Sequence, residues 1–231
     1  MPPVPKLLGP NRTYERWRWQ IFGITWLAYA GYYLTRKSFW VAKIDLEKPQ
    51  VMGLTNSDMG WIDVGNQLAY AIGQFAWGMC GDRFGTRNVV LTGMLGSVVV
   101  AGAMGMSPSV LLLGLFFGLQ GFFQSSGWAP LTKNVSCFFS QRERGTVMGV
   151  WFTNYAIGGL IASPFAGYFG QVYGWRYAFF APAAALLIVW VLFYLFQRNR
   201  PEDVGLPSIE QYHGEPEAKL EGPSMTSEEL L

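Results

Sequence analysis

A tyrosine-rich stretch that ends in two basic residues carries the clearest chemical pattern in the sequence. Tyr29, Tyr33 and Arg36 are spaced four and three residues apart. At about 100° per residue they fall within roughly 60° of one another on one helical face. A guanidinium flanked by phenols can bind a phosphate dianion through two parallel hydrogen bonds, with hydroxyl donors beside it. We therefore predict an anion-binding site centred on Arg36.

The surroundings of Arg36 leave two interpretations open. Arg36 and Lys37 lie inside an apolar segment, where a charged side chain is costly and is by default a sign of function. Both residues also lie about one turn from the end of that segment, so their side chains can extend to the water interface instead. We favour anion binding for Arg36 and the interfacial position for Lys37.

A second polar stripe lies on the next apolar segment. Asp63, Gln67, Tyr70 and Gln74 fall within roughly 60° of one another on a helix, a pattern typical of a face turned to the interior of a bundle. We expect Gln67 and Gln74 to line a cavity. Asp63, near the outer end, is expected to neutralise Lys37 or Arg36.

Two later segments add polar candidates. Gln120 and Gln124 share a helical face, and amides in such positions fit either a ligand cavity or a hydrogen bond between helices. Tyr155 precedes the pair Gly158 and Gly159 and fits either a cavity or a packing position. We include Gln124 and Tyr155 among the candidate substrate-binding residues.

The sequence lacks the residue patterns of metal sites, cofactor sites and catalytic sites. Cys80 and Cys137 are far apart without metal-ligand spacing, and His213 lies in a polar tail. There is no ATP motif and no catalytic constellation, so we expect no metal, no cofactor and no enzymatic activity. The net charge is +2 and the basic residues lie at segment ends, which argues against nucleic-acid binding.

The elements that must position these side chains are apolar helices. The chain is 51% hydrophobic and 14% charged, against roughly 25% charged residues in an ordinary globular domain. A membrane-spanning helix needs about 20 mainly apolar residues. Six segments qualify: 21–42, 59–80, 89–106, 109–130, 145–170 and 177–196. Glycines within them are expected where helices approach closely in lipid, for example Gly121 and Gly158. We therefore predict an all-α membrane protein with six transmembrane helices.

The distribution of lysine and arginine predicts the orientation. When loops are assigned alternately to two sides, twelve basic residues fall on one side and three (Lys43, Lys48 and Arg176) on the other. Cytoplasmic loops carry the excess of positive charge, so both ends are predicted to be cytoplasmic. The domains are then a cytoplasmic segment 1–20, a transmembrane domain 21–196, and a polar tail or linker 197–231. We expect an integral protein of the cell membrane.

The loop after the second segment carries a motif of glycine, aspartate and arginine. It reads Gly78-Met-Cys-Gly-Asp82-Arg83-Phe-Gly85-Thr-Arg87. Gly85 permits a tight reversal, Gly78 permits close helix approach, and Asp82 with the two arginines can form a charge-assisted latch. The motif and its place resemble the signature between helices two and three of the major facilitator superfamily.

Further motifs resemble one family within that superfamily, the organophosphate:phosphate antiporters. They are Gln124-x-x-Gly127-Trp128-x-Pro130, the run Ser140 to Gly145, the tyrosine-rich segment ending in Arg36-Lys37, and Gly205 to Glu210. The resemblance covers residues 17–212. It implies a twelve-helix fold in two halves around a central site, of which this chain is the N-terminal six-helix half. It also assigns phosphate binding to Arg36.

The resemblance implies a function and its alternatives. The leading hypothesis is a secondary transporter, or half of one, that exchanges a phosphorylated organic anion for inorganic phosphate by alternating access. The alternatives are a receptor that senses a sugar phosphate and acts on a partner membrane kinase, and a half without transport activity.

The chain departs from the glycerol-phosphate and hexose-phosphate members at two positions. Those members have histidine at the place of Tyr155 and lysine at the place of Gln74, which leaves Arg36 as the principal anion anchor. These departures leave room for a different phosphorylated metabolite, a less charged anion, or a family member that senses its ligand without carrying it.

Overall fold

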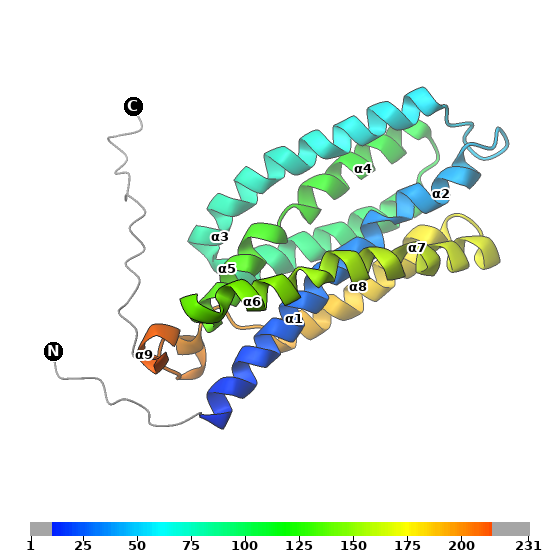
Figure 1. Ribbon diagram of the computed structural model, residues 1–231. Helices are drawn as coiled ribbons and strands as arrows, with labels where there is room; N and C mark the ends of the chain where they lie inside the picture. Colours follow the sequence, from blue (N-terminus) through cyan, green and yellow to red (C-terminus); the bar gives the residue numbers. More distant parts are fainter. Residues whose placement is uncertain (1–10, 214–231) are drawn as a thin grey trace, which may run out of the picture.

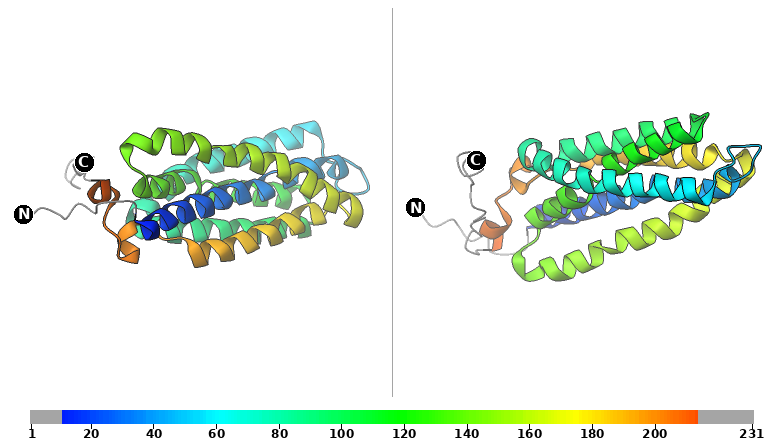
Figure 2. Two further views of the ribbon diagram at one scale, coloured as in Figure 1. Left: turned by 60° about the horizontal axis from the view of Figure 1, so that its bottom comes forward. Right: turned by 90° about the horizontal axis from the view of Figure 1, so that it is seen from above.

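The computed structural model describes residues 11–213, and this part of the chain is a bundle of helices without β-strands (Figure 1). The helices are α1 (Arg12–Arg36), α2 (Ser38–Leu46), α3 (Asn56–Met106), α4 (Val110–Gln124), α5 (Trp128–Phe138), α6 (Gln141–Trp151), α7 (Thr153–Tyr173), α8 (Tyr177–Phe196) and α9 (Ile209–His213), with a 3₁₀ turn at Pro201–Val204. The long helices run along one common axis (Figure 2).

Each predicted apolar segment lies on helix. The first falls on α1 and α2, the second and third on α3, the fourth on α4 and α5, the fifth on α6 and α7, and the sixth is α8. By length and apolar composition, three candidate spans qualify in the described chain: Asn56–Met106, Val110–Phe138 and Tyr177–Phe196. The first is long enough to contain two of the predicted segments. The all-helical class is confirmed, and the count of six spans stays a prediction. Most of the predicted tail lies outside the described residues.

The 51-residue helix α3 is broken at Gly85, whose φ of 79° and ψ of 155° are not helical. The chain reverses direction at this point, so the two parts of α3 run in opposite directions (Figure 1). A side chain at positive φ is strained, so glycine is the residue that makes this reversal without strain. The tight reversal predicted at Gly85 is therefore confirmed.

Glycines allow the helices to approach closely. A Cβ atom at Gly121 would lie 2.4 Å from the carbonyl oxygen of Asn66, and one at Gly158 would lie 2.9 Å from that of Ala30. These distances are shorter than a carbon–oxygen contact allows, so α3 packs on α4, and α1 on α7, only because no side chain intervenes. Gly78 differs: a Cβ atom there would meet nothing within 4 Å. Within residues 11–213 no other helix lies against this face of α3, so the close approach at Gly78 stays a prediction.

Two apolar clusters fill the bundle, one toward each end. The first includes Tyr29, Tyr32, Met94, Leu131 and Trp151. The second includes Phe39, Val100, Leu113, Phe117 and Phe179. The helical segments that contribute to both clusters include α1 with α2, the second part of α3, and α4 with α5. On each of these segments, some of the residues that lie in sequence between the two clusters are polar. We use the term polar layer for Arg36, Ser97, Gln120 and Gln124.

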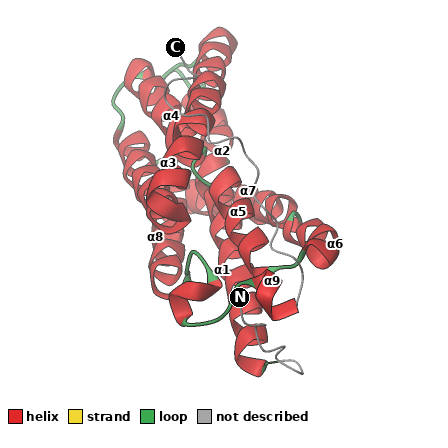
Figure 3. Ribbon diagram, turned by 90° about the vertical axis from the view of Figure 1, so that its left-hand side faces the viewer, coloured by secondary structure: helices red, strands yellow, loops and turns green. Residues whose placement is uncertain are grey.

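The end of the bundle that carries residues 11 and 213 is held by contacts between distant segments (Figure 3). The rings of Tyr14 and Tyr212 stack with centroids 4.0 Å apart. Arg18, at the start of α1, donates to Glu15 at 2.6 Å and to Glu143 at the start of α6. Arg18 is 5% exposed, so this charge is compensated by two carboxylates in a largely dry position.

Candidate functional site

Arg36 is the last residue of α1, where it meets α3 and α4. Its Nε donates a 2.8 Å hydrogen bond to Oε1 of Gln124. Its guanidinium carbon lies 4.7 Å from the centroid of the Tyr33 ring and 5.1 Å from that of the Tyr70 ring. Aromatic faces attract a guanidinium at these distances. Arg36 therefore points into the bundle and not to the interface.

Gln124 is fixed in turn by the end of α1. Its Nε2 donates to Oγ1 of Thr35 at 3.1 Å and to the carbonyl oxygen of Tyr32 at 3.5 Å. With the amide nitrogen bonded to these acceptors, Oε1 is the atom turned toward Arg36. The hydrogen-bonding alternative left open for Gln124 is thus realised, and the bond orients the cation.

The Nη2 nitrogen of Arg36 stands apart from the Nε that bonds to Gln124. Nη2 is buried and has no hydrogen-bond partner among the described residues. A buried donor without a partner is destabilising and calls for an explanation. A guanidinium that is held through Nε and lies over two aromatic rings can still donate from Nη2 to an anionic oxygen.

The predicted tyrosines take different positions. Tyr33 packs against Arg36, whereas Tyr29 is 3% exposed and lies behind it, with ring centroids 5.8 Å from Tyr33 and 5.4 Å from Trp128. Tyr70 completes the aromatic contacts of Arg36. Tyr70 was not among the predicted site residues. The sequence signal that could have added it is its place on the same polar face as Gln67 and Gln74, which were predicted.

The other three predicted side chains do not reach this cluster. Gln67, Gln74 and Tyr155 are all exposed, with Tyr155 at 50%. Gln67 and Gln74 share a face of α3 with Tyr70, which contacts Arg36, so the stripe leads from the site to the surface. Within residues 11–213 neither Arg36 nor Lys37 forms an ion pair with Asp63, and the predicted neutralisation is not found.

The charges of the motif loop pair differently from the predicted latch. Asp82 accepts a 2.5 Å hydrogen bond from Nζ of Lys133 on α5, and not from Arg83 or Arg87. Arg87 donates to the carbonyl oxygen of Tyr194 at 2.5 Å and lies 5.0 Å from the centroid of its ring. Arg83 lies over Phe84. The correction has a simple cause, because the break at Gly85 turns Asp82 and Arg87 toward different helices.

An amide cluster holds the motif loop against the end of α8. Asn199 accepts a 2.8 Å hydrogen bond from the backbone amide of Arg87, and its own carbonyl oxygen accepts one of 2.7 Å from Asn134. Gln197 donates to Oδ1 of Asn134 at 3.0 Å. The reversal at Gly85 is therefore bonded to both α5 and α8.

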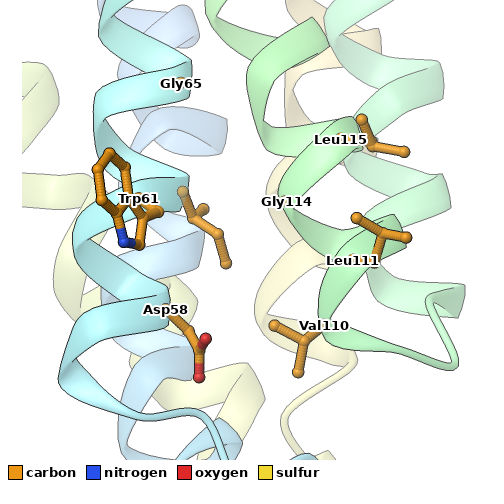
Figure 4. Close-up of a pocket in the computed structure, with 8 residues that line it drawn as sticks. Asp58, Trp61, Gly65, Val110, Leu111, Gly114 and Leu115 are labelled. Atoms are coloured by element: carbon orange, nitrogen blue, oxygen red, sulfur yellow. The ribbon is translucent and has the colours of Figure 1, made fainter.

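Two apolar hollows open between α3 and α4, away from Arg36. The one in Figure 4 is lined by Asp58, Trp61, Ile62, Gly65, Val110, Leu111, Gly114 and Leu115. The second continues along the same helices past Gly118 to Phe122. Neither contains the polar groups that would bind an anion. Across residues 11–213 no three histidine, cysteine or acidic side chains gather as metal ligands would.

The sequence of this chain is similar to those of several known proteins. The chain is 32% identical to a glycerol-3-phosphate transporter of Bacillus subtilis, over 89% of this chain and 47% of that protein. It is 32% identical to a probable hexose phosphate transport protein of Chlamydia pneumoniae, over 89% and 45%. It is 28% identical to the membrane sensor protein UhpC of Salmonella typhimurium, over 94% and 50%. The chain thus spans about half the length of the curated relatives it matches.

The fold has a counterpart among solved structures. A bacterial homolog of the human lysosomal transporter Spinster, in an inward-facing and unoccupied conformation, superposes with a TM-score of 0.63 at 16% identity, over 84% of this chain and 45% of that one. The family model described as Major Facilitator Superfamily matches residues 25–225. The chain belongs to the Major Facilitator Superfamily.

Proposed function

We propose that this chain is one six-helix half of a secondary transporter for a phosphorylated organic anion. The observation that carries the proposal is the partly buried Arg36, which lies over the rings of Tyr33 and Tyr70 and is oriented by Gln124, with its buried Nη2 forming no hydrogen bond in the described chain. A doubly charged phosphoryl group supplies the acceptor and the compensating charge that this guanidinium lacks.

The exposed polar stripe supports a second half. Gln67 and Gln74 continue from Tyr70 to the surface of the chain, and intramembrane polar side chains face a bundle interior or a water-filled cavity. A second six-helix unit placed against this face would enclose the site between two halves. Alternating movement of the halves would then open Arg36 to each side of the membrane in turn. Both described ends are cytoplasmic in this arrangement.

Exchange for inorganic phosphate is the proposed mode of transport. Inorganic phosphate presents the same oxygens to Arg36 as a phosphate ester does. If the charge of Arg36 must be neutralised by a bound anion before the halves can move, then one-for-one exchange is favoured over net release of the anion. The names of the glycerol-3-phosphate and hexose phosphate relatives support a phosphorylated substrate.

The test is counterflow of labelled inorganic phosphate in proteoliposomes, with the chain alone and with a second six-helix half co-reconstituted. We expect counterflow only when both halves are present. Absence of counterflow in both preparations would contradict the transport proposal.

A second candidate is ligand sensing, because the membrane sensor protein UhpC of Escherichia coli matches 94% of this chain at 27% identity. Phosphate binding without any counterflow, in the presence of both halves, would favour a receptor that passes the signal to a partner protein.

A further inference from the structure

Gln120 lies in the polar layer at a position bracketed by two contacts. One turn along α4 in one direction, Gln124 bonds to Arg36 and Thr35. One turn in the other direction, the ring of Phe117 stacks on that of Phe39 with centroids 4.4 Å apart. Residues three and four apart share a helical face. Gln120 therefore faces the junction of α1 and α2, directly beside the level of Arg36.

This amide is buried and has no partner. Gln120 is 1% exposed, and neither Nε2 nor Oε1 forms a hydrogen bond within the described chain. Nη2 of Arg36 and Oγ of Ser97, which belong to the same polar layer, are unpartnered as well. A glutamine that served only to join two helices would bond to one of them. Its amide instead remains available for a group that the protein itself does not supply.

The unpartnered groups differ in what they can bind. Nη2 of Arg36 only donates and carries charge, which suits a phosphoryl oxygen. Gln120 both donates and accepts, so its Oε1 can accept a hydrogen bond from a hydroxyl group and its Nε2 can donate one to a hydroxyl oxygen. Two neighbouring sites of this kind match a phosphate ester whose organic part carries hydroxyl groups.

We propose that Gln120 is a specificity-determining residue that hydrogen-bonds a hydroxyl group of the ligand's organic part, while Arg36 binds its phosphoryl group. The inference rests on the proposed function and specifies the ligand as a hydroxylated phosphate ester. A ligand that lacks this hydroxyl group would leave the buried amide without a hydrogen bond. A site of this kind therefore discriminates strongly against the ligand without the hydroxyl group.

The experiment compares three probes bound to the purified full chain in nanodiscs: glycerol 3-phosphate, propyl phosphate, which lacks its two hydroxyl groups, and inorganic phosphate. We expect the unaltered chain to prefer glycerol 3-phosphate over propyl phosphate by about tenfold. Gln120→Leu should bind the two esters equally and inorganic phosphate as before. Its thermal midpoint without ligand should rise, because a buried amide without a partner is removed.

The matched control is Asn154→Leu. Asn154 is fully buried with an unpartnered amide, but it lies between the contacts of α7 with Trp26 and Ala30, about two turns from Arg36. This variant should keep the tenfold preference. Gln120→Asn, which retracts the amide by one carbon, should lower the preference and serves if the leucine variant does not fold.

The outcomes separate the two proposals. Failure of the unaltered chain to bind any of the three probes contradicts the assignment of phosphoryl binding to Arg36, and this inference with it, whereas the counterflow experiment with both halves tests the proposed function. Phosphate binding with no preference between the esters, or with a preference that Gln120→Leu retains, overturns the inference alone. A lower thermal midpoint in Gln120→Leu with the preference intact assigns Gln120 to helix packing and also overturns it.

Discussion

Nε of Arg36 donates a hydrogen bond of 2.8 Å to Oε1 of Gln124, 88 residues further along the chain. Two consequences follow. The bond joins the end of α1 to the end of α4, and it fixes the plane of the guanidinium so that Nη2 is presented in one direction. Because Gln124 is itself held by Thr35, the orientation of the cation depends on α1 and α4 together.

Arg36→Lys should weaken phosphate binding by roughly 10- to 100-fold, which corresponds to the ~1.5–3 kcal/mol of a hydrogen bond to a charged group. A lysine keeps the charge but cannot bond to Gln124 and to a phosphoryl oxygen with a planar fork. Isothermal titration with inorganic phosphate measures the loss. Lys37→Arg is the matched control, and equal affinity in Arg36→Lys would contradict phosphate binding through the guanidinium fork of Arg36.

Gly85→Ala should lower the free energy of unfolding by about 1–3 kcal/mol, because the substitution places a side chain at positive φ. A Cβ atom at Gly85 would also lie 3.0 Å from Nδ2 of Asn199. Thermal unfolding in detergent measures the change. Gly78→Ala is the control within the same motif: the surrounding space is open, so the gain in helix propensity of ~0.5–1 kcal/mol should leave it equal or more stable. Equal loss in both variants would contradict this account.

Glu143→Gln should destabilise the chain at pH 7 and have less effect in acid. Partial burial raises the pKa of the Glu143 carboxyl, but hydrogen bonds from the Ser140 backbone amide and from Arg18 outweigh it, so the pKa lies below its usual value. A lowered pKa in the folded state gives stability that is complete above the unfolded value of about 4.3 and is lost as the pH falls through the folded value.

Thermal midpoints of the wild type and of Glu143→Gln, measured from pH 7 down to about pH 2, test this sign, because the loss falls below the unfolded pKa. The difference between the two proteins should shrink as the pH falls. Asp45→Asn, in the exposed pair of Asp45 with Lys48, should change little at any pH. A difference that grows in acid would assign Glu143 a different role.

Asp82→Asn should cost less than about 1 kcal/mol of stability, because exposed ion pairs contribute little. The side chains of Asp82 and Lys133 are 71% and 52% exposed. If the pair instead sets the conformation of the motif loop, phosphate counterflow in the two-half preparation should fall. The charge-reversed double variant Asp82→Lys with Lys133→Asp should then restore counterflow. Failure of the double variant to restore it would show that Asp82 acts on another group.

The parts of this structure that depend on local pattern were predictable. Helical periodicity placed Tyr33 and Arg36 on one face, and the motif located the reversal at Gly85. Partners from distant segments could not be predicted in the same way. Lys133 lies 51 residues beyond Asp82, and Tyr212 lies 198 residues beyond Tyr14. Periodicity says which side of a helix is polar, but not which neighbour meets it.

Gln67, Gln74 and Tyr155 remain uncovered on the surface of the described chain. Cellular quality control responds to such a surface, since amides that face lipid mark a membrane protein as incompletely assembled. The lifetime of this chain in a cell should then be set by how quickly a second helical unit covers that surface.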